Sequence, residues 1–262
     1  LHLDPALIPW PTARVDVRSA VSVAAAFEAD RPGVVINCAA WTDVDAAESR
    51  PDEAFAVNAA GAAHLAEACD RHGARMLQVS TDYVFDGSKS SPWTEQDPVG
   101  PLGVYGASKL EGERAVAAHC RDHAIVRTAW LYGPWSRRSF VDTMLRLTAE
   151  RPSVDAVADV TGSPTLTFDL ARALLFLARH TFRGTLHAAN TGVTSWHGIA
   201  AEIVRLTART CEVRPVPQTA FPRPARRPAN SALDSSRLRE IGHPMRPWGE
   251  ALADHVGRQS RR

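Results

Sequence analysis

Short apolar runs alternate with segments of helical period through most of this sequence. GVVINCAA at 33–40 is rich in β-branched residues and predicts a buried strand. Residues 52–72 carry apolar side chains at helical spacing and end at Gly73, a residue that suits a helix C-cap. ARMLQVS at 74–80 predicts the next strand. A strand, a helix and a second strand in this order imply parallel strands joined by a right-handed crossover.

The alternation continues beyond residue 80. The predicted elements are a loop at 81–103, helices at 104–121, 139–150, 167–180 and 196–209, and strands at 124–132, 154–158 and 185–188. This order predicts the α/β class, with a doubly wound parallel sheet that helices cover on both faces. After about residue 182 the pattern loosens into a Pro- and Arg-rich tail, which we interpret as a smaller lobe over the carboxyl edge of the sheet.

Composition excludes several classes of protein. The 262 residues are 45% hydrophobic and carry a net charge of +1, which allows a substantial core and argues against a broad nucleic-acid footprint. We find no apolar run long enough to span a membrane and no signal peptide. The cysteines have no metal-ligand spacing, and we expect buried thiols of a reducing cytoplasm at Cys38, Cys69, Cys120 and Cys211.

Arginine supplies nearly all of the positive charge. Of 30 basic residues, 28 are Arg, and the two lysines are Lys89 and Lys109. Lys109 follows Tyr105 by four residues in the predicted helix 104–121, so the two side chains share one helix face. Because a nearby ammonium stabilises a phenolate, we expect Lys109 to lower the pKa of Tyr105. The alternative is a solvated surface pair, which contributes roughly 0.2–0.5 kcal/mol.

Polar residues follow the predicted strands at the edge where open α/β sheets bind ligands. These clusters lie at 39–42, 80–83 and 128–130, and the helix of Tyr105 begins on the same side. A hydroxyl of Ser80 or Thr81 there can hydrogen-bond a carbonyl oxygen that a tyrosine protonates. Together the hydroxyl, Tyr and Lys predict a carbonyl reduction site, which needs only a hydride donor.

Six motifs carry a resemblance over essentially the whole chain. They are STDYVFDG at 80–87, VYGASK at 104–109, RTAWLYG at 127–133, NCAAWTDVDAAE at 37–48, TGSPT at 161–165 and PARRPANS at 224–231. In this order they resemble the extended short-chain dehydrogenase/reductase family, and within it the deoxysugar 4-ketoreductase group that includes the dTDP-4-dehydrorhamnose reductases. YxxxK alone would be weak evidence, whereas the ordered set is highly specific.

The resemblance implies a Rossmann-type fold and a reductase that uses NADPH, with NADH as the alternative. The implied reaction is reduction of the 4-keto group of a dTDP-linked 6-deoxyhexose. The favoured substrate is dTDP-4-dehydro-β-L-rhamnose, which would give dTDP-L-rhamnose. It implies a dinucleotide-binding domain at 1–127 and 153–181, and a nucleotide-sugar lobe at 128–152 and 182–262. The excess of six positive charges at 214–262 suits a pyrophosphate partner.

The resemblance also implies roles for individual residues. Thr81 matches the catalytic hydroxyl, Tyr105 the proton donor, and Lys109 the residue that binds the nicotinamide ribose. The positions implied to line the cofactor, besides Tyr105 and Lys109, are Asp16, Val17, Ala40, Trp41, Thr42 and Val79. The positions implied to contact the substrate are Thr81, Asp82, Trp130, Arg226, Arg227 and Asn230.

One feature departs from the family. A first strand and a Gly-rich turn that hold the cofactor pyrophosphate are expected, but no G-x-x-G-x-x-G precedes residue 33. The chain begins with Leu1 near the place of the second strand, at 6–10, so we expect a missing N-terminal piece; loss of dinucleotide binding is the alternative. The motif PTARVD that follows has Arg14 and no acid before Asp16, which favours NADP over NAD.

Simpler structural roles stay open. Trp130 could be core, and Arg226 with Arg227 could be a solvated charge cluster. For the acidic residues Asp43, Asp45 and Glu48 we favour capping of the following helix over a metal site. At the level of the whole protein, the alternatives are a non-catalytic regulatory or interaction subunit and a ketoreductase of an antibiotic deoxysugar pathway. We expect a cytoplasmic monomer or homodimer that binds neither nucleic acid nor membrane.

Overall fold

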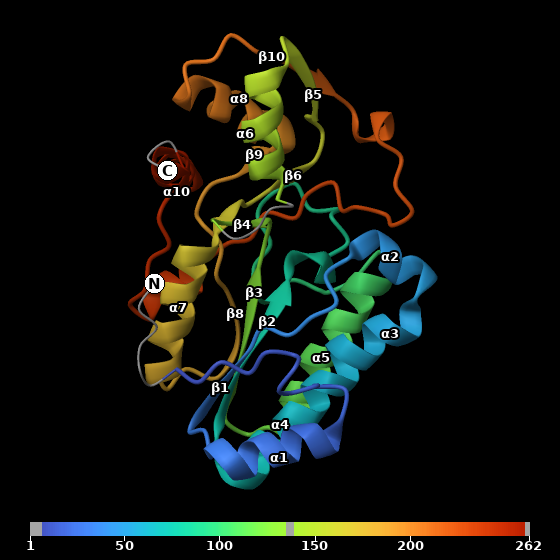
Figure 1. Cartoon of the computed structure of the whole chain (residues 1–262), viewed down its shortest axis with the longest axis vertical. Helices are drawn as coiled ribbons and strands as arrows, with labels where there is room; N and C mark the ends of the chain where they lie inside the picture. Colours follow the sequence, from blue (N-terminus) through green and yellow to red (C-terminus); the bar gives the residue numbers. More distant parts are fainter. Residues whose placement is uncertain (1–6, 135–138, 260–262) are drawn as a thin grey trace.

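A computed structural model describes residues 7–134 and 139–259, and a parallel sheet lies at the centre (Figure 1). Within these ranges the sheet has the order β1-β2-β3-β8, and neighbouring strands pair in parallel throughout. Its strands are β1 (Val34–Asn37), β2 (Arg75–Thr81), β3 (His123–Thr128) and β8 (Gly184–His187). The α/β class and the parallel sheet predicted from the alternation are confirmed.

Helices cover both faces of this sheet, and its strands are accordingly buried on both sides. On one face lie α1 (Ala20–Asp30), α4 (Gly61–His72) and α5 (Val104–His119), while α7 (Thr167–Arg179) packs on the other face (Figure 1). Two buried clusters form between these layers, one that includes Phe27 and Met76 under α1 and α4, and one that includes Leu77 and Leu174 under α7.

The predicted helix 52–72 is a nearly continuous helical segment with one wider turn. It consists of α3 (Pro51–Phe55), a π-helical turn at Ala56–Ala60, and α4. Pro51 occupies the first turn, and Gly73 ends the segment with a positive φ of 69°. The π turn contains the buried Asn58, and such turns often lie at functional sites.

A smaller lobe stands beyond the carboxyl edge of the sheet (Figure 1). It contains three two-stranded pairs, β4–β7, β5–β10 and β6–β9, and a core that includes Tyr132, Ile199 and Leu252. The bounds of its elements are β4 (Leu131–Tyr132), α6 (Phe140–Glu150), β5 (Ser153–Val157), β6 (Thr161–Gly162), β7 (Thr165–Leu166), β9 (Thr194–Ser195), α8 (Trp196–Leu206), β10 (Glu212–Val216) and α10 (Trp248–Gln259).

The strand pairing corrects the expected division of the chain at two strands. β5 was placed in the dinucleotide-binding domain, but it pairs with β10 in the smaller lobe. β8 was placed in the lobe, but it pairs with β3 and forms an edge of the central sheet. Both strands are short and of mixed composition, SVDAV and GTLH, and such segments do not specify which neighbour completes their hydrogen bonding.

Other expectations also need correction. Residues 7–10 form no strand; Trp10 instead packs on Phe27, with ring centroids 5.5 Å apart. The predicted strand 124–132 is interrupted at Trp130, whose φ of 47° cannot continue an extended chain. Cys38 is exposed, whereas the other three cysteines are buried as expected. Helices that the sequence analysis did not predict are α1, α2 (Val44–Ser49), α9 (Ser236–Glu240) and α10.

Candidate active site

The predicted catalytic residues meet at the carboxyl edge of the central sheet. Thr81 is the last residue of β2, and Tyr105 and Lys109 lie in the first two turns of α5, which packs on β2. The start of α5 is fixed by Glu48 of α2, because its carboxylate Oε1 accepts the backbone N–H of Val104 at 2.8 Å. This hydrogen bond caps the helix and sets where Tyr105 begins.

Lys109 is a buried cation with spare donors. Its side chain extends from α5 to β2, where Nζ donates to the backbone carbonyl of Val79 at 2.7 Å. Burial lowers the pKa of Lys109 to about 8, and the charge of Glu113 one turn further along α5 opposes that shift. An ammonium has three donors, so two remain for a ligand beside Val79.

The pKa of Tyr105 moves against our expectation. Burial of the phenol raises its pKa to about 12, the charge of Asp82 acts in the same direction, and a hydrogen bond with Thr81 opposes both. Lys109 was expected to lower this pKa, but its ammonium is directed at the carbonyl of Val79. Tyr105 is therefore a protonated phenol at neutral pH, the form that a proton donor requires.

Asp82 is a buried carboxyl group directly beside the hydroxyl of Thr81. The Thr81 hydroxyl donates to Asp82 Oδ1 at 3.0 Å and accepts the backbone N–H of Tyr83 at 3.2 Å. Only 2% of Asp82 is exposed, and burial raises its pKa to about 6 although the hydroxyls of Ser231 and Thr81 lower it. Thr81, Asp82 and Tyr105 thus form one connected group at the sheet edge.

Trp130 is held in a strained backbone conformation by contacts on several sides. Its ring stacks on Trp196 of α8 at a centroid distance of 3.6 Å, and its Nε1 donates to Ser231 Oγ at 3.1 Å. Gly162 lies so close that a Cβ there would be 2.3 Å from the indole. These contacts place the indole between the sheet edge and the smaller lobe, where it packs against a buried apolar cluster on each side.

Four of the positions expected to line the cofactor, Ala40, Trp41, Thr42 and Val79, lie near the carboxyl ends of β1 and β2. The loop after β1 contains Ala40, Trp41 and Thr42, and Asn58 fixes it by accepting the N–H of Trp41 at 2.8 Å. The same amide donates to Ser108 of α5 at 2.9 Å. A dinucleotide fits this edge, since Ala40 and Trp41 are half-buried, Thr42 is exposed, and Lys109 retains donors beside Val79.

Comparison with known proteins assigns the fold and the family. The family model described as RmlD substrate binding domain matches residues 4–260. The chain belongs to this family. A dTDP-4-dehydrorhamnose reductase of Mycobacterium tuberculosis is 51% identical over 84% of this chain and 75% of its own length. One of Streptomyces griseus is 47% identical over 92% and 81%, respectively.

Solved structures of the same group superpose closely. A dTDP-4-dehydrorhamnose reductase of Clostridium acetobutylicum has a TM-score of 0.92 and 41% identity, covering 97% of this chain and 90% of that one. One of Bacillus anthracis, in complex with NADP, has a TM-score of 0.94 and 36% identity over 98% and 92%. The resemblance inferred from the six motifs is therefore confirmed at the level of the family.

The basis for cofactor choice in the N-terminal residues changes with the structure. Arg14 was taken as a partner for a 2′-phosphate, but its Nη2 pairs with the carboxylate of Asp30 at 2.6 Å. Asp16 pairs with Arg18, whose hydrogen bonds lower the pKa of Asp16 to about 2. Arg14 thus has an internal counter-ion and does not support NADP, for which the complex of the Bacillus anthracis relative is the stronger indication.

The position of Val17 is set by tertiary packing. It packs against the first core cluster, and a Cβ on Gly61 at the start of α4 would lie 2.8 Å from its Cγ2. His64 Nδ1 is 3.0 Å from the carbonyl of Val17. The backbone of this segment is therefore fixed against α4, as a lining for a bound ligand requires.

A chain segment at 221–231, which we call the strap, contains the family motif PARRPANS. Arg227 Nη2 pairs with Asp45 of α2 at 2.9 Å, and Ala225 N donates to the same carboxylate at 3.2 Å. Asn230 is buried; its amide donates to the carbonyls of Lys89 and Ser91. Arg226 is exposed and makes no hydrogen bond or ion pair with any described residue.

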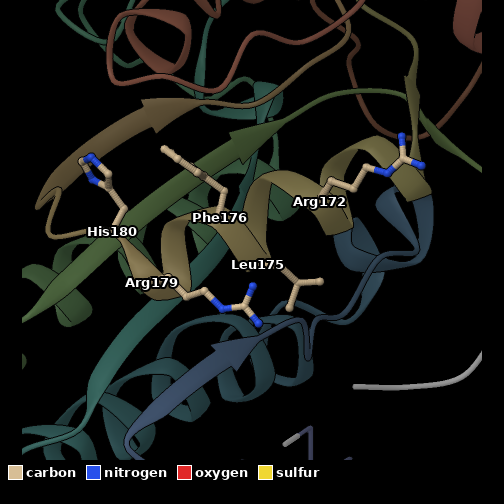
Figure 2. A pocket seen from close by; sticks show the side chains of 5 residues that line it. All are labelled: Arg172, Leu175, Phe176, Arg179 and His180. Carbon is tan, nitrogen blue, oxygen red and sulfur yellow. The ribbon is translucent and has the colours of Figure 1, made fainter. Parts of the chain in front are cut away.

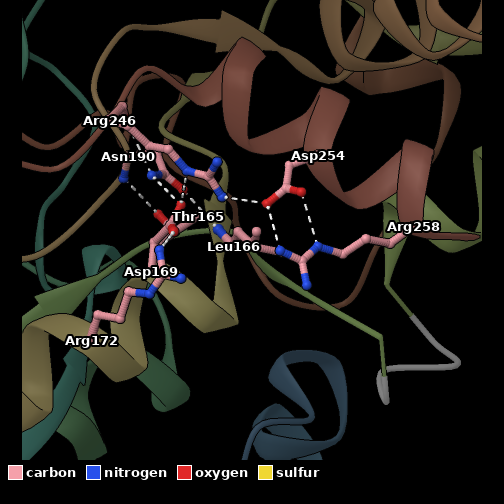
Figure 3. Close-up of polar contacts among 8 residues, drawn as sticks. All are labelled: Thr165, Leu166, Asp169, Arg172, Asn190, Arg246, Asp254 and Arg258. Carbon is pink, nitrogen blue, oxygen red and sulfur yellow. Dashed lines mark hydrogen bonds and ion pairs between the residues drawn. The ribbon is translucent and has the colours of Figure 1, made fainter.

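Several of the arginines from residue 214 onward form ion pairs with aspartates, which neutralise much of this positive charge. Figure 3 shows Arg246 bridging Asp169 of α7 and Asp254 of α10, with Arg258 on the far side of Asp254. Asn190 also donates to Asp169, at 2.9 Å. These ion pairs join α10 to α7, so this part of the charge excess holds the fold together.

A surface pocket of about 370 Å³ lies away from the catalytic residues. It is formed along the exposed side of α7, as Figure 2 shows, by Arg172, Leu175, Phe176, Arg179 and His180. Because α7 covers the sheet face opposite to α5, this pocket lies on the other side of the sheet from that helix (Figure 1).

Two supporting residues were not identified from the sequence as parts of the site. Glu48 was expected, with Asp43 and Asp45, to cap the following helix. Asp43 does cap α2 by accepting the N–H of Ala46 at 3.0 Å, whereas Glu48 lies inside α2 and caps α5. Asn58 joins the loop of Trp41 to α5, and a Cβ at Gly112 would lie 2.1 Å from its carbonyl oxygen. The glycine in KLEGE is the only signal that another backbone approaches α5 there.

Proposed function

We propose that this chain reduces the 4-keto group of dTDP-4-dehydro-β-L-rhamnose with NADPH and so forms dTDP-L-rhamnose. The convergence of Thr81, Tyr105 and Lys109 at one end of β2 is the observation that supports this most strongly. Relatives named dTDP-4-dehydrorhamnose reductase support the choice of sugar nucleotide.

The residues of the site suit the acid half of a ketone reduction. NADPH, when bound, supplies the hydride. The oxygen of the keto group becomes an alkoxide, and Tyr105 donates the proton that turns it into an alcohol. The phenol is protonated at neutral pH because burial raises its pKa to about 12. The Thr81 hydroxyl, whose proton Asp82 Oδ1 accepts in this structure, would turn that proton to the substrate oxygen when the sugar binds.

Lys109 and the loop after β1 would hold the cofactor. The ammonium of Lys109 has donors left for ribose hydroxyls, while Ala40, Trp41 and Thr42 belong to the loop that Asn58 fixes. Val79 contributes its half-buried side chain at the same edge. We assign Asp16 and Val17 to the adenosine end.

The smaller lobe would bind the nucleotide sugar. Asp82, which accepts from Thr81 at the sheet edge, and Trp130, which stacks on Trp196 of the lobe, would contact the sugar from these two sides. Arg226 is the residue of the strap whose guanidinium is uncommitted, so it suits the pyrophosphate. Arg227 and Asn230 act by holding the strap in place.

A reductase of an antibiotic deoxysugar pathway is a second candidate. A relative from Streptomyces antibioticus, named a probable dTDP-4,6-dihydroxy-2-methyloxan-3-one 4-ketoreductase, is 43% identical over 92% of this chain. The non-catalytic alternative gains no support from the site, because a binding subunit needs no Thr, Tyr and Lys gathered at one end of β2. We further propose a cytoplasmic monomer or homodimer, consistent with the free cysteines.

Activity assays with two different substrates distinguish these candidates. NADPH oxidation is followed with dTDP-4-dehydro-β-L-rhamnose and, separately, with dTDP-4-dehydro-6-deoxy-D-glucose, and the products are identified by proton NMR. We expect kcat/KM to be highest for the rhamnose precursor. A preference for the glucose derivative would favour the antibiotic pathway. NADPH binding without turnover of either compound would contradict both enzymatic proposals.

A further inference from the structure

Asp45 of α2 holds the strap through two of its residues. Its carboxylate Oδ2 pairs with Arg227 Nη2 at 2.9 Å, and its Oδ1 accepts the backbone N–H of Ala225 at 3.2 Å. Arg227 Nη1 also donates to the carbonyl of Ala225 at 3.1 Å, so Asp45, Ala225 and Arg227 form a closed ring of hydrogen bonds. Arg223 adds a longer contact, since its Nη1 lies 3.7 Å from the same carboxylate. We call Asp45, Ala225 and Arg227 the bracket.

Arg226 lies between the two strap residues of the bracket. Hydrogen bonds on both sides fix its backbone, whereas its guanidinium is exposed and makes no hydrogen bond or ion pair with any residue in the described ranges. An arginine fixed in this way loses little further conformational freedom when it binds an anion. Its planar fork also suits the bidentate geometry of a phosphate. The bracket therefore presents a guanidinium without a counter-ion at a defined place.

The second half of the strap is anchored without Asp45. Gly87 has a positive φ of 80°, and a Cβ there would lie 2.6 Å from the backbone N of Ala229, so the strap rests directly on the chain at Gly87. The carbonyl of Asn230 accepts Nε1 of Trp93 at 2.9 Å. A substitution at Asp45 should therefore release residues 225–227 and leave residues 229–231 in place.

The helix that carries Asp45 also fixes the start of the catalytic helix. Glu48, three positions after Asp45 in α2, accepts at 2.8 Å the N–H of Val104, the residue before Tyr105. A Cβ at Gly103 would lie 2.5 Å from the same Glu48 oxygen, so α2 meets the start of α5 closely. Through these two carboxylates, one short helix connects the strap to the catalytic edge. A substrate with a pyrophosphate at one end and a keto group at the other requires such a connection, because both ends must be bound at once.

We propose that Asp45 is a positioning residue, which sets Arg226 at a fixed place relative to Tyr105 so that Arg226 binds the pyrophosphate of a nucleoside-diphosphate sugar. The ligand rests on the proposed function, while the bracket is a property of the protein alone. The consequence is that a carboxylate strengthens the binding of an anion. If charge alone acted, Asp45 would repel the pyrophosphate, and its removal would tighten binding. If Asp45 positions Arg226, its removal weakens binding.

Binding of dTDP measures this effect without turnover, because dTDP has the pyrophosphate and no keto group. Isothermal titration calorimetry on the full chain compares the unmodified protein with Asp45→Asn. We expect the Kd for dTDP to rise about threefold to tenfold, since asparagine has a similar shape but lacks the charge that pairs with Arg227. Asp45→Ser, a shorter acceptor without charge, should act in the same direction and covers the case in which the asparagine variant does not fold.

Asp155→Asn is the matched control. Asp155 of β5 pairs with Arg214 of β10 at 2.8 Å, so this variant loses the same charge and an arginine–aspartate pair without a change in the bracket. Its Kd for dTDP should stay within about twofold of that of the unmodified protein. Arg226→Ala supplies a second control. Because Asp45 acts through Arg226, Asp45→Asn should cause no further rise in Kd when residue 226 is already alanine.

Limited digestion with trypsin tests the bracket in the absence of any nucleotide. Arg223 and Arg227 are each followed by proline, which blocks trypsin, so cleavage within the strap is expected after Arg226. Mass spectrometry of the fragments should show faster cleavage there in Asp45→Asn and an unchanged rate in Asp155→Asn. Equal rates in Asp45→Asn and the unmodified protein would contradict the fixing of the strap by Asp45.

Kinetics separate positioning from general support of the fold. With NADPH and the keto sugar, Asp45→Asn should raise KM for the sugar by a similar factor and leave kcat within about twofold, a split that a general loss of structure does not give. An equal or lower Kd for dTDP in folded Asp45→Asn, or a further rise in the Arg226→Ala background, would overturn the inference. If the unmodified protein binds no dTDP, the proposed function and the ligand of Arg226 both fail, whereas the trypsin experiment still decides whether Asp45 fixes the strap.

Discussion

The catalytic edge and the strap both contain family motifs, but their polar side chains are used differently. At the edge, the ammonium of Lys109 makes one hydrogen bond to Val79 and keeps two donors. In the strap, the amide of Asn230 donates to two carbonyls, and its oxygen accepts Thr161 Oγ1 and the N–H of Ala232. A polar group with unused capacity can act on a ligand, whereas a saturated one holds the fold.

The pKa shifts follow the same division. At the edge, burial moves the pKa of Tyr105 up to about 12 and that of Lys109 down to about 8. Such shifts show that burying these groups costs free energy, and groups of this kind cluster at functional sites. In the strap, Arg227 has its counter-ion Asp45. Shared motif membership therefore does not imply a shared role, and substitutions in the two regions should have different consequences.

The largest expected effect is on catalysis at the edge. Tyr105→Phe removes the only proton that we assign to the alkoxide, so kcat should fall by about 10²- to 10⁴-fold while substrate affinity stays similar. Steady-state kinetics with NADPH and the keto sugar measure both. Tyr83→Phe is the control, because Tyr83 packs edge-to-face on Tyr105 at 5.6 Å without a role in proton transfer. Full turnover by Tyr105→Phe would remove Tyr105 from the mechanism.

The second effect is on stability and belongs to the strap. Asn230→Ala leaves the carbonyls of Lys89 and Ser91 without their donor in a buried place, so the free energy of unfolding should fall by about 2–4 kcal/mol. Urea unfolding measures this loss. Arg226→Ala, an exposed change in the same strap, should stay within about 0.5 kcal/mol of the unmodified protein. Equal stability of the two variants would contradict a structural role of Asn230.

The third effect is a pH dependence of cofactor binding. The pKa of Lys109 is lowered to about 8, so its amine is charged below that pH and loses a proton and its charge above it. NADPH affinity should therefore weaken above pH 8, by up to about tenfold per pH unit. Fluorescence titration of NADPH measures this. Lys109→Arg stays charged, so its affinity, even if weaker, should not vary over that range.

Local patterns were sufficient to predict the strands of the central sheet and α5, but not which strands belong to that sheet. β1, β2 and β3 have short apolar stretches bounded by polar residues, and burial imposes that pattern wherever a strand lies inside. Helix α1 escaped prediction because AVSVAAAFEAD is apolar almost throughout and shows no clear helical face. The break at Trp130 escaped it too, because a positive φ is unusual for tryptophan and has no sequence signal.

Contacts between distant residues could not be predicted in this way. Glu48 caps α5 across 56 positions, and Arg14 meets Asp30 only because α1 folds back beside it. The direction of the pKa shift of Tyr105 has the same origin. Helical spacing places Lys109 one turn from Tyr105, but its ammonium donates to the backbone carbonyl of Val79 instead. The position of that carbonyl depends on where β2 lies, which helical spacing does not reveal.

The smallest effect distinguishes the two neighbouring arginines of the strap. Arg227→Ala breaks a partly buried pair with Asp45, so the free energy of unfolding should fall by about 1 kcal/mol. Arg226→Ala breaks no contact with a described residue, so stability should hold while KM for the nucleotide sugar rises about threefold to tenfold, and that rise should shrink at high salt. Urea unfolding and kinetics at two salt concentrations measure the two arms. If Arg227→Ala instead raises KM at unchanged stability, the ion pair with Asp45 does not stabilise the fold in solution. Arg227 would then bind the substrate, as we propose for Arg226.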